Sequence, residues 1–210
     1  MIEIRHRESG SVLLRLPVDT LVGRNFKGKR LVDADFSNML LSNTDFCHAN
    51  LAAVDFHDAM LEEALFCSAV LLSVNLEKAV LLAADFTDAQ VAGSSFRHSD
   101  LQKSIFRYAR VTDADFSHAN LSHADLSMAT ISGSFVGADL HGADLRGADL
   151  RDADLADANF ADAKLQSAKL VGKTLTAKQI GLVRQAKEDA HSIERCSPAH
   201  ERRAWWRFWN

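Results

Sequence analysis

The chain has 210 residues, of which 47% are hydrophobic and 25% are charged, so it can form one domain with its own core. No segment reaches the roughly 18 consecutive apolar residues of a membrane-spanning helix, and the first eight residues are charged where a signal peptide is apolar, so we expect a cytoplasmic protein. The net charge of −4 is unevenly spread: residues 31–175 carry 10 basic and 21 acidic groups, residues 1–30 carry 7 and 3, and residues 176–210 carry 7 and 4. An acidic middle therefore lies between two basic ends.

Residues 1–20 read as a β-hairpin. Two apolar-rich segments, residues 2–7 and 11–16, flank Glu8-Ser9-Gly10, and the second segment stops at Pro17. We expect this hairpin to cover the beginning of the structure that follows it.

A five-residue repeat occupies residues 21–175. It is clearest in residues 137–150, where Ala-Asp-Leu recurs at every fifth position. A large apolar residue, the centre of each unit, follows the same spacing from Leu21 to Ile131 and again from Phe135 to Leu175. Of the 12 Phe in the chain, 11 are centres, so the spacing is not accidental. Ala stands two positions before the centre in 20 of the 32 units, which predicts a small and a large residue side by side in a narrow interior.

A period of five fits neither regular element. On a helix, five residues advance by about 500°, so successive centres would be scattered around the axis. In a flat strand, an odd period sends alternate centres to opposite faces. The pattern therefore predicts a backbone that turns after every unit and returns each centre to the inside.

The unit A(D/N)Lxx resembles the pentapeptide-repeat family over residues 21–175, about three quarters of the chain. The resemblance implies an all-β solenoid, a right-handed quadrilateral β-helix with four units per turn. From residue 36 to residue 116 the centres alternate between Phe and an aliphatic residue, with Leu76 as the one exception. This alternation independently favours an even number of units per turn, with Phe on two opposite walls.

The repeat slips once in phase. Ile131 and Phe135 are four residues apart, so one corner must be short, and Gly133 offers the backbone freedom that a tightened turn needs. We interpret the slip as a tolerated deletion, with a functional kink as the alternative.

Residues 176–210 follow the repeats. Thr176 to Gln179 form a capping box, which predicts an α-helix to about Glu194 that caps the C-terminal end of the coil. Beyond Ser197-Pro198, three Arg accompany a cluster of aromatic residues that we expect to dock on the acidic wall of the coil, either in the same molecule or in a second copy as a homodimer. The aromatic residues are Trp205, Trp206, Phe208 and Trp209.

The polar residues do not indicate catalysis. The repeated Asp, such as Asp139 and Asp144, occupy outward positions on different walls, where a solvated role is expected rather than acid–base chemistry. His98 and His118 stack at a spacing of 20 residues without a third ligand beside them, so no metal site is predicted. There is also no phosphate-binding loop and no nucleophile elbow. We expect a protein that is not an enzyme and has no cofactor.

The three cysteines are expected to be free thiols. Their number is odd in a chain without a secretion signal, which argues against a disulfide framework. Cys47 and Cys67 should stack on neighbouring turns, but parallel side chains about 4.8 Å apart match poorly the Cβ separation of about 3.8 Å in a disulfide. Redox sensing is the alternative for this pair.

An apolar stripe is the candidate partner surface. Leu40, Met60 and Val80 replace the usual Asp or Asn at 20-residue spacing, with Leu82 beside Val80. Val70 and Leu72 are expected to extend the stripe on an adjoining wall. The alternative is that these are scattered surface aliphatic residues, which are common.

Three functions compete at this point. The first is a rigid scaffold that binds a protein partner of unknown identity. The resemblance implies a second, because some pentapeptide-repeat proteins are acidic DNA mimics that bind type II topoisomerases such as gyrase. The acidic middle favours mimicry, but Arg97, Arg107, Arg110, Arg146 and Arg151 interrupt it. The third hypothesis is membrane association through the Trp and Arg tail, which the acidic bulk of the protein opposes. No direct binding of nucleic acid is expected.

Overall fold

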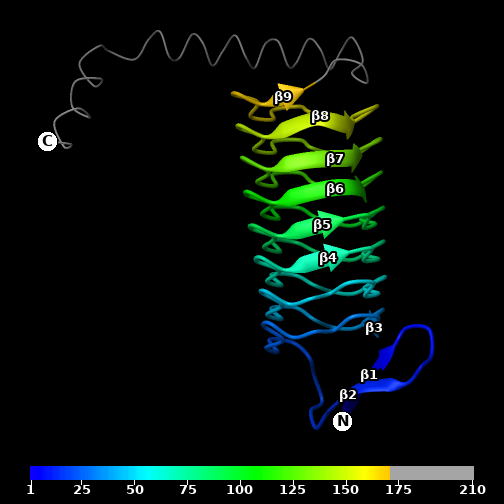
Figure 1. Cartoon of the computed structure of the whole chain (residues 1–210). Coiled ribbons are helices and arrows are strands. Elements are labelled where there is room, and N and C mark those ends of the chain that lie inside the picture. Colours follow the sequence, from blue (N-terminus) through cyan, green and yellow to red (C-terminus); the bar gives the residue numbers. More distant parts are fainter. Residues whose placement is uncertain (171–210) are drawn as a thin grey trace, which may run out of the picture.

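The computed structural model describes residues 1–170, and these residues form a β-solenoid. Figure 1 shows a coil whose successive turns lie one above another, from blue at the N-terminus to yellow near residue 170. Within residues 1–170 there is no helix, and so none that could cross a membrane. The helix predicted from Thr176 and the aromatic tail lie outside the described residues.

Residues 1–170 contain nine strands, which belong to two sheets. Strands β1 (Ile2–His6) and β2 (Val12–Leu16) form a sheet with β3 (Ala34–Asp35) in the order β2-β1-β3. The other six strands pair in parallel, each with the strand one turn further along the coil. They are β4 (Val70–Leu72), β5 (Gln90–Ala92), β6 (Arg110–Asp115), β7 (Thr130–Ser134), β8 (Asp149–Asp154) and β9 (Lys169–Leu170).

Four ladders of parallel bridges run along the coil. Each joins residues 20 positions apart, and 19 positions apart where a ladder crosses the phase slip. We name the ladders in chain order by the residues just before the centres. Ladder 1 contains Asp45, Leu65, Asp85, Ile105, Asp125 and Asp144; ladder 2 contains Asn50, Val70, Gln90, Arg110, Thr130 and Asp149; ladder 3 contains Asp35, Asp55, Asn75, Ser95 and Asp115; ladder 4 contains Leu40, Met60, Val80, Asp100, Asn120 and Asp139. Four units therefore separate one bridge of a ladder from the next.

The centres fill the interior, as the sequence predicts. Phe86 has no exposed surface and stacks on Phe66 at 4.7 Å and on Phe106 at 4.5 Å between ring centroids. Phe86 also meets Phe96 of the same turn edge-to-face at 5.9 Å. Such aromatic contacts each contribute roughly 0.5–1.5 kcal/mol beyond the burial of area. The Phe ladders therefore hold successive turns together from the inside.

Small hydroxyl residues replace Ala at some inward positions. Ser99 and Ser104 are fully or almost fully buried, and each hydroxyl donates a 2.7 Å hydrogen bond to a backbone carbonyl three residues earlier. A buried hydroxyl without such a bond would destabilise the core by roughly 1–3 kcal/mol. The interior is therefore apolar, except where a buried hydroxyl is hydrogen-bonded to a nearby backbone carbonyl.

Each unit ends in a tight turn, which explains the five-residue period. The N–H of Ala34 donates to the carbonyl of Leu31 at 3.2 Å, and Asp33 between them has a φ of 56°. The corresponding position has a positive φ in most units, including at Ala53 and Tyr108. L residues other than Asn and Asp rarely adopt this conformation, so the lattice of backbone bonds between turns must enforce it.

The phase slip is accommodated at Gly133. Its φ is 115°, and a Cβ there would lie 2.7 Å from the backbone nitrogen of Ala114 and closer still to the carbonyl oxygen. Gly133 pairs with Ala114, so it takes over the inward position that Ala occupies elsewhere. The N–H of Asp113 donates to the hydroxyl of Ser132 at 3.1 Å. The shortened corner predicted between Ile131 and Phe135 is thus confirmed, and only Gly fits it.

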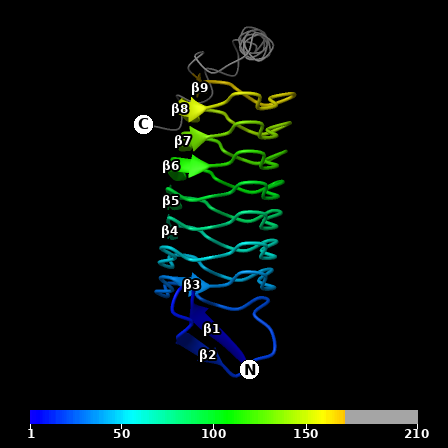
Figure 2. The same cartoon turned by 90° about the vertical axis from the view of Figure 1, so that its right-hand side faces the viewer.

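The predicted hairpin is present at the N-terminal end of the coil, where Figures 1 and 2 both place it. β1 pairs with β2 and also, in antiparallel fashion, with β3 through Arg5 and His6. Ile4 of β1 is completely buried and belongs to the same core as the first centres of the repeat. The hairpin is therefore anchored to the coil both by backbone pairing and by packing.

Candidate partner-binding surface

Because the interior is filled, any binding chemistry must lie on outward side chains. Four exposed or partly exposed apolar residues form what we call the apolar strip: Leu40, Met60, Val80 and Leu82. Leu40 bridges Met60, and Met60 bridges Val80, so three successive turns place them side by side on ladder 4. Leu40 is 58% exposed, Met60 40% and Leu82 38%. Three adjacent turns therefore place exposed or partly exposed apolar residues in one column.

The apolar residues of the strip lack a side-chain hydrogen bond that the repeat usually makes at this position. Elsewhere the Asp or Asn at this position accepts the N–H two residues later, as Asp45 does from Cys47 at 2.9 Å and Asp85 from Thr87 at 2.8 Å. Leu and Val have no acceptor atom for this bond, and the Met thioether is only a weak acceptor. The strip thus places exposed apolar side chains in three consecutive turns where the repeat usually has a stabilising polar residue.

The structure corrects the extent of the strip. Val70 and Leu72 were expected to lie beside it, but Val70 belongs to ladder 2, which ladders 1 and 3 separate from ladder 4 on either side. Val70 follows Leu40 by 30 residues, which is one and a half turns of 20, so it lies on the far side of the coil. The neighbour that sequence reasoning missed is Leu65, which follows Met60 in the same turn and is 38% exposed.

Carboxylates surround the strip. Glu62 points outward beside Met60 and accepts a 2.6 Å hydrogen bond from the hydroxyl of Ser42, and Glu63 is exposed at the next corner. On ladder 1, Asp45 and Asp85 lie on either side of Leu65. Residues 31–96 contain ten acidic residues and a single basic one, Lys78. The apolar strip therefore has a strongly negative rim.

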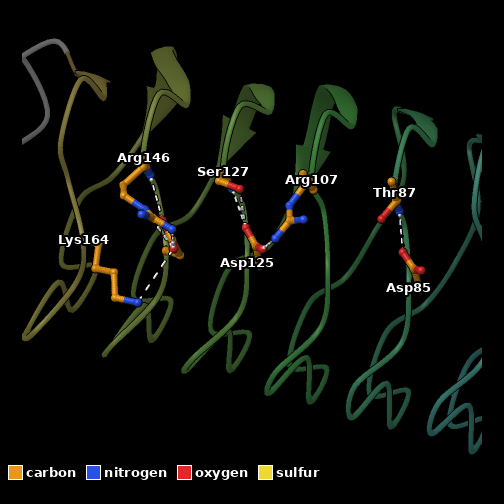
Figure 3. Close-up of polar contacts among 8 residues, drawn as sticks. Asp85, Thr87, Arg107, Asp125, Ser127, Arg146 and Lys164 are labelled. Carbon is orange, nitrogen blue, oxygen red and sulfur yellow. Dashed lines mark hydrogen bonds and ion pairs between the residues drawn. The ribbon is translucent and has the colours of Figure 1, made fainter. Parts of the chain in front are cut away.

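Further along the coil, four carboxylates pair with Arg: Asp115, Asp125, Asp144 and Asp149. Figure 3 shows Arg107 directed at Asp125, with an ion-pair distance of 2.5 Å, and Ser127 beside the same carboxylate. Partial burial would raise the pKa of Asp125, but the hydrogen bonds from Ser127 and Arg107 outweigh it, so this pKa lies below its usual value. Asp144 is contacted by both Arg146 and Lys164. This part of ladder 1 is a row of paired charges, not a free acidic track.

The cysteine prediction is wrong for one pair. Cys47 and Cys67 form a disulfide between adjacent turns, with their Cα atoms 4.6 Å apart. The stacking of residues 20 positions apart brings the two Cα atoms into the range that a disulfide spans, and the expected parallel geometry does not prevent the bond. Cys196 lies outside the described residues.

Two other features carry no evident chemistry. His98 and His118 stack at 5.2 Å as predicted, and residues 1–170 hold no cluster of His, Cys, Asp or Glu suited to a metal ion. A cavity of about 440 Å³ lies between the hairpin and the first turn, which sequence reasoning did not anticipate. Its lining residues are Leu13, Leu14, Lys29, Arg30, Leu31, Val32 and Asp33.

Comparison with known proteins identifies the class. A sequence model of pentapeptide repeats, in eight copies, matches residues 30–66, 68–102, 94–133 and 134–172. The chain therefore belongs to the pentapeptide repeat family. No curated protein sequence matches it.

Several solved structures are similar to this chain. Full-length QnrB1, a plasmid-mediated fluoroquinolone resistance protein, is 23% identical, with a TM-score of 0.54 over 79% of this chain and 95% of that one. A trypsin-treated form of QnrB1 gives a TM-score of 0.53 at the same identity and coverage. HetL, a protein of heterocyst differentiation regulation from the cyanobacterium Nostoc, is 26% identical with a TM-score of 0.31 over 71% of this chain and 84% of its own. The likeness to QnrB1 concerns the solenoid.

Proposed function

We propose that this protein is a non-catalytic scaffold whose apolar strip and acidic rim bind a protein partner. The observation that carries the proposal is the replacement of the turn-forming Asp or Asn by Leu40, Met60 and Val80 in three consecutive turns. An exposed apolar cluster with a polar rim is typical of a protein interface. Parallel bridges between successive turns fix the backbone at these positions, so little backbone conformational entropy is lost when a partner binds.

The scaffold role also accounts for the outward Asp residues. Asp55, Asp115 and Asp139 each accept the N–H two residues later, which occupies the carboxylate in shaping the turn. Such a carboxylate is a structural acceptor and not a free acid or base. A non-catalytic function follows from this use of the repeat.

The proposal includes a right-handed, four-sided coil with the hairpin as its N-terminal cap. Connections between parallel strands of one sheet are right-handed in nearly all proteins, and four ladders imply four faces. The burial of Ile4 supports the capping role of the hairpin. A crystal structure resolves handedness and cross-section directly, and a left-handed coil would contradict this part.

The alternative function is DNA mimicry toward a type II topoisomerase. The ten acidic residues among residues 31–96 favour it, as does the fold that this chain shares with a fluoroquinolone resistance protein. The Arg pairs on ladder 1 and the apolar strip within the acidic region favour the scaffold. We therefore expect no protection of gyrase. Dose-dependent rescue of supercoiling from a topoisomerase poison would replace the scaffold with the mimic.

The test of the scaffold uses variants matched by repeat position. Leu40→Asn with Met60→Asn restores the family-typical acceptor, so the double variant should fold at least as well while losing the apolar strip. Val70→Asn makes the same change on ladder 2 and serves as the control. Affinity capture from the source cells with quantitative mass spectrometry should show a stoichiometric partner that the double variant loses and the control retains. Equal partner spectra for both variants would contradict the proposal.

A further inference from the structure

We propose that the apolar strip is occupied by the protein's own C-terminal segment, residues 199–210, which binds it in the same molecule and competes with the partner. The inference rests on the proposed function of this surface and names its first ligand. It makes the protein self-inhibited until a partner displaces the segment.

The segment has the chemistry that the strip requires. Within residues 199–210 are four large aromatic residues, three Arg and one acidic residue, Glu201. The aromatic residues are Trp205, Trp206, Phe208 and Trp209, and the Arg are Arg202, Arg203 and Arg207. Aromatic side chains bury about 150–250 Å² each and need an apolar surface, whereas the Arg between them need carboxylates.

The strip is the described surface that offers both. Its apolar side chains lie among Glu62, Glu63, Asp45 and Asp85, in a region of the chain that contains no Arg. Leu72 is exposed too, but it pairs with Ala92 and not with a large apolar residue. Val22, Tyr108 and Met128 are also exposed, and they lie in turns that carry Arg24, Arg107 or Arg110. An Arg-rich segment is repelled by those turns and attracted to the strip.

The chain is long enough for contact within one molecule. The described coil ends at Leu170, and Met60 lies 110 residues earlier, or five and a half turns of 20. At about 4.8 Å per turn, the strip is roughly 26 Å back along the coil. Of the 28 residues between 170 and 199, the predicted helix over residues 176–194 would span about 28 Å and the other nine up to roughly 30 Å, which together exceed this distance. A tethered ligand has a local concentration on the order of millimolar, so even a weak contact within the molecule is well populated.

The experiment uses the intact chain and its own Trp fluorescence. All three Trp of the protein lie in this segment, so Trp emission reports on it alone. We expect blue-shifted emission and several-fold protection from a soluble quencher in the full-length monomer. Leu40→Asn with Met60→Asn should shift the emission to that of water-exposed Trp, and Val70→Asn should leave it unchanged. Higher salt should reduce the protection, because Arg and carboxylate contacts are screened.

Several outcomes would overturn the inference. They are water-exposed Trp emission in the full-length monomer, and an equal response to the double variant and to Val70→Asn. A blue shift that appears only with a dimeric mass in sedimentation would make a second copy the occupant. A blue shift that requires anionic vesicles would make it the membrane. If the double variant loses the captured partner but keeps its Trp emission, the inference fails and the proposed function stands. If it changes neither, both fail.

Discussion

The turns built from residues 31–96 and those built from residues 97–170 share one interior but differ in their outer surface. Inside, the same ladder of centres continues from Phe86 through Phe106 to Leu126, and all three are essentially buried. Outside, residues 31–96 carry ten acidic residues against one basic, whereas residues 97–170 carry eleven against eight. The repeat thus constrains what points inward and leaves the outward positions free to diverge along the rod.

The outer difference is one of pairing as well as number. In the C-terminal half, Arg97 pairs with Asp115 at 2.8 Å and Arg151 with Asp149 at 2.8 Å. Residues 31–96 contain no Arg, and their carboxylates have other partners, such as Lys78 for Glu77 at 3.7 Å and Asn75 for Asp55 at 3.0 Å. The C-terminal half thus pairs four of its carboxylates with Arg, whereas the N-terminal half combines the apolar strip with a larger net negative charge and no Arg.

The largest effect should come from a charge in the shared interior. Phe86→Asp puts a carboxylate among stacked rings and should destabilise the protein by more than about 4 kcal/mol, because the charge has no partner there. Leu126→Asp, in the other half of the same ladder, should be equally damaging. Thermal unfolding monitored by circular dichroism measures both. Outward Asp149→Ala should cost far less, and comparable melting shifts for all three variants would mean that the inside and outside assignments are wrong.

The second effect separates the slipped corner from an ordinary one. Gly133→Ala drives a methyl group into the backbone of Ala114 and should cost about 3 kcal/mol or more. Gly93→Ala, in the N-terminal half, has only the Ser73 hydroxyl at 3.8 Å and should cost about 1 kcal/mol for its positive φ. Denaturant unfolding gives both values. Equal costs would show that the backbone can relax at the slip.

Phe86 and Gly133 show how much of the interior could be predicted from the sequence. The interior was predictable because a narrow core admits only a small and a large residue per unit, so Phe86 and Gly133 are restricted by backbone geometry. The far-side position of Val70 was accessible too, since 30 residues at 20 per turn leave half a turn over. Val70 was wrongly placed on an adjoining wall because the repeat units between Leu40 and Val70 were not counted.

Outward contacts were less accessible to sequence reasoning. The pairing of Arg146 with Asp144 depends on which way two exposed side chains turn, and the repeat does not restrict this. The Cys47–Cys67 bond depends on tenths of an ångström between stacked residues, which a mean strand spacing does not supply. The place of Leu65 beside Met60 was missed, because it requires the path of the chain around the corner.

The third effect is confined to the N-terminal half. The Cys47–Cys67 bond closes a loop of about 20 residues, so reduction should destabilise the protein by up to about 3 kcal/mol in the chain-entropy model. Amide hydrogen exchange should accelerate around residues 47–67 and not in the C-terminal half. Denatured protein should show one reactive thiol before reduction and three after it, and Cys196→Ser should lower the first number to none. Three thiols without reductant would indicate the reduced pair, which a cytoplasmic location favours.

The smallest effect concerns the paired charges of the C-terminal half. The side-chain hydrogen bond from Arg151 is the main cause that lowers the pKa of Asp149 to about 2, and Lys169 adds a weaker attraction. A carboxyl whose pKa is lower in the folded than in the unfolded chain stabilises the fold above the unfolded pKa of about 3.9, and this stability is lost as the pH falls through the folded pKa. Arg151→Gln should therefore raise the pKa of Asp149 toward its usual value, as measured by NMR titration of the carboxyl carbon. Its melting temperature should fall slightly below that of the parent at pH 6 and coincide with it near pH 2. Arg151→Lys keeps the charge but loses the bidentate hydrogen bond. In this variant the pKa of Asp149 should therefore lie between its value in the parent and its value in Arg151→Gln. A pKa that stays near 2 in Arg151→Gln would show that Arg does not neutralise this half of the coil, and the contrast between the two halves would then rest on residue counts alone.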